Sequence, residues 1–476
     1  MPRVRLLIIL LAAALLGAAG WWTVRTTQRQ RLVAQHLPAI PPLQGWPAEL
    51  GTRLAEADAD ARSWRHSASG LAALSRLYHA NGFYPEALLC YDGLRAIQPR
   101  EARWPHLQAA ILADFGRTDE ARPLRRQAAA LAADYKPARL READVLLKAG
   151  LPPDAQGAYE AVLRDFPGEP YALLGLARCA MERHDWNGAR GHLQTALASN
   201  PDFIGALSLL VTVRERLGEP AAAEELRARI AGREFTDLPD PWLDELAAVC
   251  FDAYRLSVAA VVARASGDTA RALALLERAT ALAPGVSSYF RQAAQIYLAD
   301  RDYGSAKWKL EQAVAVNPAD ADAWMLLLGA LRGLGQEAAA STALQQALGH
   351  CPQSPGLQLE RARWLKAQGR LAEAIAAFRL SHSLRPSEAT PLVELANTAF
   401  AADRAEEGLA ALREALARQP GHPMALVSLT FYHIVSGDEA GARRHWEEVR
   451  RQPRTPPAMA DDLRRAFRRQ FGRDLP

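Results

Sequence analysis

The chain has 476 residues, too many for one compact core, so it must form several domains or a repeat array. Hydrophobic residues make up 49% of it and charged residues 23%, as in ordinary folded proteins, and a net charge of +4 is too small to indicate a nucleic-acid-binding protein. The four cysteines form no CxxC pair, and we interpret them as small buried side chains.

The N-terminal segment is strongly apolar. Residues 6–24 carry no charge and would span about 28 Å as a helix, close to the thickness of the hydrocarbon core of a bilayer. Arginines flank this stretch on both sides, and Trp21 and Trp22 stand where an interfacial aromatic belt would lie. We predict a transmembrane signal anchor over residues 1–24, in a bacterial inner membrane, with the remaining chain in the periplasm. The alternatives are a cleaved signal peptide that releases the protein to the periplasm, and a cytoplasm-facing orientation.

The next two segments precede any repeat. Residues 25–46 contain three prolines and are predicted to be a spacer between the membrane and the folded part. Residues 47–64 are predicted to form a single helix that caps a repeat array at its N-terminal end.

A period of 34 residues dominates the rest of the chain. Prolines recur at this spacing in the second half, at Pro284, Pro318, Pro352, Pro386 and Pro420. The same period runs through the first half in another phase, through Pro99, Pro167 and Pro201, with Ala133 at the missing proline. Proline makes up about 6% of the chain, so four consecutive matches after a chosen first proline have a chance probability on the order of 1 in 100,000. The pattern therefore indicates an internal repeat.

Within each period the apolar residues follow the pattern of a helical hairpin. Leu71, Leu74 and Tyr78 lie on one face of a first helix, and Asn81-Gly82 predicts a turn. A small residue then stands where the two helices cross, and the periodic proline ends the second helix.

Such residues are similar to the tetratricopeptide repeat (TPR) consensus. Clear examples are Trp324, Leu327, Ala340, Leu344 and Pro352, or Leu71, Leu74, Tyr78, Ala87, Tyr91 and Pro99. The departures are modest: Leu328 replaces a small residue, Gly408 replaces an alanine and Ala133 replaces a proline.

This resemblance covers about 370 of the 476 residues and implies an all-α superhelix of eleven helix-turn-helix units. Five units begin near residues 68, 102, 136, 170 and 204, so that residues 47–237 hold the cap helix and the first block. Six begin near residues 253, 287, 321, 355, 389 and 423, and fill residues 253–456.

An insertion separates the two blocks. Pro201 and Pro284 lie 83 residues apart, which is 15 more than two periods. We place the insertion at 238–252 and predict that it is helical, because Asp240 followed by Pro241 is a helix-start signal; one long helix would then cover about 241–265. The insertion is either a packing adaptor or a contact site that uses Trp242 and nearby acids (Asp237, Asp240, Asp244 and Glu245).

Residues 457–476 are predicted to form a C-terminal capping helix. Met459, Leu463, Phe467 and Phe471 make an apolar stripe that should cover the last unit, as solenoids require. The opposite face carries arginines, which are either solvated or in contact with anionic lipid or an acidic partner.

No catalytic motif is present in the sequence: we find no GxxxxGK[ST], HExxH or GxSxG. The eleven histidines do not cluster with metal-ligand spacing. We therefore predict that the protein is not an enzyme and needs no cofactor or metal.

In the TPR family the first helices of the units line a groove that binds peptides. Carrying those positions over gives these candidate groove residues: Arg76, His79, Arg178, Thr212, Arg216, Arg264, Arg291, Arg332, Arg363, Lys366 and Asn397. The set is mainly basic, which favours a ligand with carboxylates, although scattered solvated charges are the alternative. The paired Lys and Asn of the family's carboxylate-binding variant are missing.

The layout of anchor, spacer and array resembles that of assembly and biogenesis factors. We therefore predict a membrane-tethered protein–protein interaction scaffold or assembly factor that binds extended or helical peptide segments, possibly acidic ones. Two alternatives stay open: a cytoplasm-facing regulatory adaptor of an envelope biogenesis pathway, and an exported soluble chaperone. Neither the partner nor the oligomeric state follows from the sequence.

Overall fold

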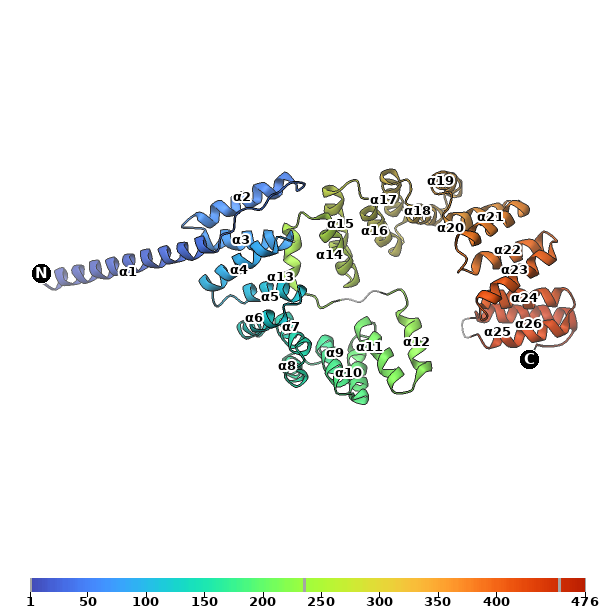
Figure 1. Ribbon diagram of the computed structural model, residues 1–476, viewed down its shortest axis with the longest axis horizontal. Helices are drawn as coiled ribbons and strands as arrows, with labels where there is room; N and C mark the ends of the chain where they lie inside the picture. The colour runs from blue at the N-terminus through green and yellow to red at the C-terminus, as the bar shows by residue number, and fades with distance from the viewer. Residues whose placement is uncertain (1, 234–236, 453–454, 476) are drawn as a thin grey trace. The chain divides into compact units, whose positions relative to one another are not determined.

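The computed structural model describes residues 2–233, 237–452 and 455–475, with the side chains of 2–15 and 17–19 left aside. Every regular element in this described part is helical, and the fold is an all-α solenoid of helical hairpins with 26 α-helices and no strands (Figure 1). The chain divides into two compact units, Met1–Ala283 and Pro284–Pro476, and each is described by itself.

The first unit contains two N-terminal helices, five helical hairpins, the insertion and a sixth hairpin. Its elements are α1 (Pro2–Gln35), α2 (Ala48–Arg62), α3 (Ser67–Ala80), α4 (Tyr84–Ile97), α5 (Arg103–Asp114), α6 (Thr118–Leu131), α7 (Lys136–Lys148), α8 (Pro152–Asp165), α9 (Pro170–Glu182), α10 (Trp186–Ser199), α11 (Ile204–Arg216), α12 (Pro220–Ile230), α13 (Pro241–Asp244), the 3₁₀ helix η1 (Glu245–Val249), α14 (Ala253–Ala265) and α15 (Thr269–Leu282).

The second unit contains five hairpins and a final helix. Its elements are α16 (Ser287–Ala299), α17 (Tyr303–Val316), α18 (Ala321–Gly333), α19 (Glu337–His350), α20 (Pro355–Ala367), α21 (Leu371–Leu384), α22 (Thr390–Ala401), α23 (Ala405–Arg418), α24 (Pro423–Val435), α25 (Glu439–Arg450) and α26 (Pro457–Phe471). We call the first helix of each hairpin its A helix and the second its B helix.

The hairpins follow from the residues that recur with the period. In the first hairpin Leu71, Tyr78 and Ala87 are fully buried, and Gly82 reverses the chain with a φ of 83°, which glycine adopts at little cost. The B helix α17 ends at Val316, two residues before Pro318, because the residue that precedes a proline disfavours the helical conformation. The same pairing of helix end and proline recurs along the chain and sets the hairpin lengths.

The N-terminal prediction needs correction. Among the described residues no helix is long and apolar enough to cross a membrane, so the prediction of a single-pass inner-membrane protein anchored through residues 6–24 is wrong. Helix α1 runs on without a break to Gln35. Its C-terminal end instead packs on α3 and α4, where Val33 is buried.

The insertion also differs from its prediction, because it is not one long helix. A single turn of α-helix, α13, is followed by the 3₁₀ helix η1, and α14 begins only at Ala253. Cys250 and Asp252 are extended, and the Asp252 carboxylate caps α14 by accepting hydrogen bonds from two backbone N–H groups. Tertiary contacts of the 237–252 backbone replace the missing helical hydrogen bonds, as described below. Residues 234–236, which precede the insertion, lie outside the described residues.

At the C-terminus, α26 packs against α24 and contributes to a compact apolar cluster. Trp446, Leu463 and Phe467 are at most 1% exposed in this cluster. The guanidinium groups of Arg443 and Arg464 lie over the Phe467 and Trp446 rings, at 5.1 Å in each case.

Candidate functional site

The insertion segment, residues 237–252, lies along the A helices of the first unit. It runs from α9 and α7 past α5 to α3, opposite to the order of the repeats, and Figure 1 shows α13 beside α5 and far from α12. We call the surface of α3, α5, α7 and α9 that it contacts the first A-face. Three groups of contacts hold the segment there.

At the start of the segment, Asp237 meets α7 and α9. Its carboxylate accepts a 2.8 Å hydrogen bond from Arg141, and its backbone oxygen accepts a 3.0 Å bond from the Tyr171 hydroxyl. The neighbouring Leu238 is 8% exposed and joins the apolar core around Leu140 and Cys179. Burial raises the pKa of Asp237, but the Arg141 guanidinium outweighs that effect, so this pKa lies below its usual value.

At the centre, Asp240 enters a buried polar network. His106 Nε2 lies 2.6 Å from one Asp240 carboxylate oxygen, and the Tyr135 hydroxyl donates to the other at 2.7 Å. Arg125, itself 4% exposed, lies 3.2 Å from His106 Nδ1. Every charge in this network therefore faces a partner, as a buried charge requires.

The protonation states of the network agree with this geometry. Burial lowers the pKa of His106, which keeps the ring neutral, so that Nε2–H donates to Asp240 while Nδ1 accepts from Arg125. Burial raises the pKa of Asp240, but the hydrogen bonds from His106 and Tyr135 more than compensate, and the carboxylate stays ionised. Burial lowers the pKa of Arg125 to about 10, which still leaves it a cation.

Trp242 fills an aromatic slot next to this network. Its ring stacks on Tyr135 with centroids 3.7 Å apart and planes 11° apart, and the His106 ring meets it edge-on. Arg103 lies 5.5 Å from the same ring and pairs with Glu245 at 3.0 Å. The Trp242 backbone N–H donates to the Tyr135 hydroxyl, so side chain and backbone are held together.

The end of the segment is held by the side-chain amide of Asn81 at the end of α3. This amide donates to the backbone oxygen of Val249 at 3.0 Å and accepts from the backbone N–H of Phe251 at 2.6 Å. Because both bonds go to backbone groups, they recognise an extended chain and no particular side chain.

The sequence-predicted residues of the first unit take different places. Arg178 helps to line a hollow with Arg141, Asp237 and Leu238, next to the insertion segment. His79 is 7% exposed and its Nδ1 lies 3.0 Å from the Tyr91 hydroxyl, so it belongs to the interior of the α3–α4 hairpin. The remaining ones do not appear among the segment's contacts described above: Arg76 donates to the Ala72 backbone oxygen, Arg216 lies over the Trp186 ring, and Thr212 and Arg264 are exposed on α11 and α14.

Sequence reasoning missed the residues that hold the insertion segment, namely Arg103, His106, Tyr135 and Arg141. A signal for them did exist in the insertion itself. Residues 237–252 contain five acids and no Lys or Arg, a surplus that calls for cations elsewhere in the fold.

The predicted cations of the second unit form a ladder of ion pairs between consecutive A helices. We call the surface formed by Arg291, Arg332, Arg363, Lys366 and Asn397 on α16, α18, α20 and α22 the second A-face. Its pairs are Arg291 with Asp322 at 2.7 Å, Arg332 with Glu360 at 2.5 Å, Arg363 with Glu360 and Glu394 at 2.9 Å each, and Lys366 with Glu394 at 3.9 Å. Asn397 is half-buried on α22.

Charge is layered on the second A-face. The side chain of Glu360 is 7% exposed and that of Glu394 is 26% exposed, whereas Arg332, Arg363 and Lys366 are 40%, 42% and 37% exposed. Burial lowers the pKa of Arg363, but the nearby carboxylates of Glu394 and Glu360 more than offset this effect. Its pKa is therefore raised, and Arg363 stays positively charged. The three cations face two carboxylates that lie deeper, so solvent meets the positive charges first.

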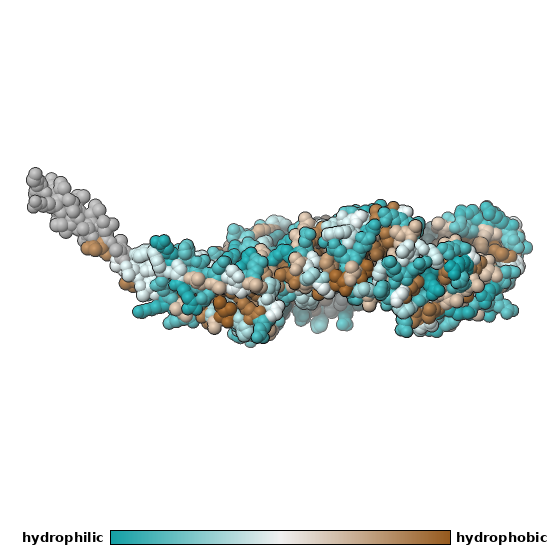
Figure 2. Space-filling model, turned by 90° about the horizontal axis from the view of Figure 1, so that it is seen from above, coloured by the Kyte–Doolittle hydropathy of each residue, from teal (hydrophilic) through white to brown (hydrophobic). Residues whose placement is uncertain are grey.

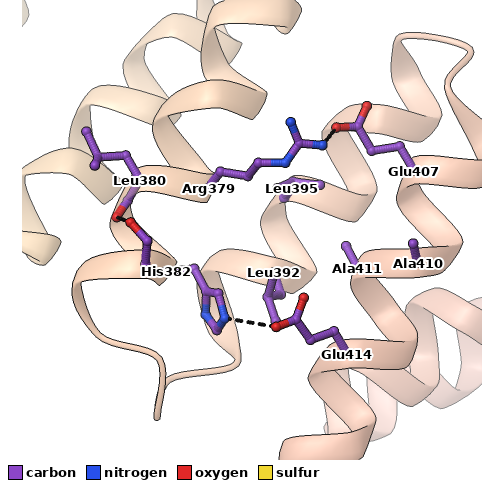
Figure 3. Close-up of a pocket in the computed structure, with 10 residues that line it drawn as sticks. Arg379, Leu380, His382, Leu392, Leu395, Glu407, Ala410, Ala411 and Glu414 are labelled. Carbon is purple, nitrogen blue, oxygen red and sulfur yellow. Dashed lines mark hydrogen bonds and ion pairs between the residues drawn. The ribbon is translucent and has the colours of Figure 1, made fainter.

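The B-helix side of the second unit carries a hollow lined by paired charged side chains. It lies between α21 and α23, with Arg379 beside Glu407 and with His382 Nε2 3.4 Å from Glu414 (Figure 3). These groups pair across the hollow and link neighbouring hairpins. Within the described residues, no group of three or more His, Cys, Asp or Glu side chains is placed to hold a metal ion.

The face in Figure 2 is a mixture of hydrophilic and hydrophobic areas. Singly exposed apolar residues are normal on such a surface.

Comparisons with known proteins match two stretches of the repeats to a family model. The tetratricopeptide repeat family model matches residues 140–202 and 291–355, and no curated protein matches the chain. Among similar solved structures, YrrB, a TPR protein with an unusual peptide-binding site, is 24% identical over 37% of this chain and 91% of its own, with a TM-score of 0.31. Yeast Tom70 is 14% identical over 86% of this chain and 97% of its own, with a TM-score of 0.37. The type IV pilus biogenesis factor PilW is 21% identical over 39% of this chain and 86% of its own, with a TM-score of 0.36.

All three TM-scores are below 0.5, so we draw no conclusion about function from these structures. The family match, the 34-residue period and the observed hairpins agree with one another. The described part of the chain therefore forms an all-helical solenoid of repeated hairpins, which over residues 140–202 and 291–355 match the tetratricopeptide repeat model.

Proposed function

We propose that the protein is a protein–protein interaction scaffold that binds peptide segments of other proteins, preferably acidic ones, on its second A-face. The observation that carries this proposal is the layered charge of that face, where Arg332, Arg363 and Lys366 lie outward over the less exposed Glu360 and Glu394. Guanidinium groups held in this way are already ordered, so a carboxylate can bind to them at a small entropic cost.

Exposed apolar side chains extend this face toward the C-terminus. Phe431 on α24 occupies the repeat position of Asn397, 34 residues later, and it is 49% exposed. Val435, one turn further along α24, is 63% exposed. A ligand that places carboxylates over Arg363 and an apolar side chain over Phe431 would use both parts of the surface.

The test is an affinity capture with the full chain. We compare the wild type with the variant R332Q/R363Q/K366Q and with the control R370Q/R385Q/R418Q, which removes the same charge from arginines paired with Glu373, Glu388 and Glu414. In the first variant Glu360 loses both of its arginine partners. Thermal unfolding of all three proteins therefore verifies that the fold is kept.

We expect the wild type and the control to retain the same partner proteins, and the second A-face variant to lose them. Binding should also weaken as the salt concentration rises, because the cations are exposed. Unchanged capture by the folded R332Q/R363Q/K366Q variant would show that the second A-face does not bind the partners.

A further inference from the structure

The insertion segment has the chemistry of a peptide ligand. Its five acids and the absence of Lys and Arg complement the arginines around it. Pro239 and Pro241 restrict the residues before them to extended conformations, and Asp240 has φ −134° and ψ 92°. The start of the segment, up to Asp240, is therefore held extended by its own sequence, and a preordered chain loses little conformational entropy when it binds.

The first A-face holds the segment by means that do not depend on chain connectivity. His106 and Tyr135 receive the Asp240 carboxylate, and Tyr135 also stacks on the Trp242 ring. Asn81 clamps the backbone on both sides of Cys250. A peptide from another molecule with the same side chains would find the same partners.

The ion pairs on either side of these central contacts are open to solvent. The side chain of Asp237 is 62% exposed and that of Glu245 is 49% exposed, although both are paired with arginines. The segment's own regular structure is only the four residues of α13 and the five of η1. A competitor can therefore engage Arg141 or Arg103 before the central contacts open, because exposed pairs exchange readily.

We propose that the first A-face is a binding site for acidic peptides that carry an Asp-Pro-Trp element, and that the insertion segment occupies it in cis. A partner of this chemistry binds when it displaces Asp240 and Trp242. Because the segment is tethered at both ends, its effective concentration is on the order of millimolar, so the site is closed to weak ligands. This inference concerns the first unit and does not depend on the proposed function of the second A-face.

The experiment uses a labelled synthetic peptide of residues 237–251 and the full-length protein. The variant D240N/W242A releases the segment in cis and leaves His106, Tyr135 and Asn81 unchanged. Fluorescence anisotropy should give a micromolar Kd for this variant, and binding at least ~10-fold weaker for the wild type, since the occupied site must open first.

Two controls locate the binding. A peptide with the D240N and W242A changes should bind the released variant at least ~10-fold more weakly, because it lacks both anchors. Adding Y135A to the released variant should weaken binding of the unchanged peptide to a similar degree. Equal binding of the unchanged peptide to the wild type and the released variant, or no binding to either, overturns the proposal.

If circular dichroism shows that the released variant is unfolded, hydrogen exchange of the wild type decides instead. The backbone N–H groups of Trp242 and Phe251 are held by Tyr135 and Asn81. An exchangeable occupant predicts that these amides exchange at least ~10-fold faster than those of α5 and α7, by local opening. If the amides of the segment and of α5 and α7 exchange at the same rate, the proposed displacement is contradicted. The segment would then leave the first A-face only when the whole unit unfolds.

Discussion

His106 Nε2 lies 2.6 Å from Asp240 Oδ2, although 134 residues separate the two in the chain, and the two side chains are 0% and 3% exposed. Asp240 is the only carboxylate hydrogen-bonded to His106 in the described structure. The other nitrogen of the neutral ring accepts a hydrogen bond from Arg125. This pair is the buried centre of the contact between the insertion segment and the first A-face.

Replacing Asp240 by Asn should therefore destabilise the first unit by about 2–3 kcal/mol, because a buried Arg125 loses its nearby negative charge and a charged hydrogen bond is lost. Urea unfolding followed by tryptophan fluorescence measures the change. Asp244 provides the control, since its side chain is 38% exposed and pairs with Arg271 at the surface. D244N should cost less than about 0.5 kcal/mol, and equal losses in the two variants would contradict a special role for Asp240.

The hairpins could be predicted from the sequence because their determinants are local. Tyr78, Ala87 and Pro99 all lie within one 34-residue period, and each acts on neighbours that the period itself places. The path of the insertion could not be predicted in this way. Pro241 correctly indicated a helix start, but Asn81 and His106 decide the conformation of the residues that follow, and only the fold brings them near.

The candidate site shows the same division. Repeat positions placed Arg332 and Arg363 on consecutive A helices, and the structure brings them together on Glu360. The repeat pattern did not reveal that the carboxylate is already there, because Glu360 stands at a position that carries no consensus residue. Pairing between hairpins is a tertiary property, and it changes an open basic surface into a layered one.

Stability should depend on pH through His79. Burial lowers its pKa to about 3, whereas an unfolded histidine titrates near 6.5. The unfolded state therefore binds more protons below pH 6.5, and the contribution of His79 is complete above that value and is lost as the pH falls toward 3. The slope is about 1.4 kcal/mol per pH unit for one proton.

The variant H79Q should flatten the loss of stability between pH 6 and pH 4.5, at the expense of some stability at neutral pH because the bond to Tyr91 changes. Urea midpoints at several pH values give the measurement. H66Q is the control, since His66 is exposed next to the same helix. An unchanged slope in H79Q would mean that His79 does not resist protonation in the folded state.

At Gly70 the helix α3 lies close against the backbone of α2. A Cβ at this position would lie 2.1 Å from the Ala61 backbone nitrogen and 2.6 Å from the Asp60 carbonyl carbon, and backbone atoms cannot give way cheaply. G70A should cost about 2–3 kcal/mol. Gly157, inside α8, has nothing within 4 Å of the same position, so G157A should stabilise the helix by up to about 1 kcal/mol. Thermal unfolding of both variants tests the pair; a neutral G70A would mean that α2 moves aside freely.

Phe467 ties the final helix to the solenoid. It is fully buried beside Trp446 and Leu463, and a solenoid needs such a cap because its last hairpin has no following neighbour. F467A should cost about 3–5 kcal/mol locally, by leaving a cavity under α26.

F471A is the control, since Phe471 is only partly buried although its ring lies 4.6 Å from that of Phe467. Hydrogen exchange should show α24 and α25 losing protection in F467A and keeping it in F471A, while α16 and α17 stay unchanged, because stability in a solenoid passes mainly between neighbouring hairpins. Loss of protection throughout the second unit would instead indicate that its hairpins unfold as one cooperative body.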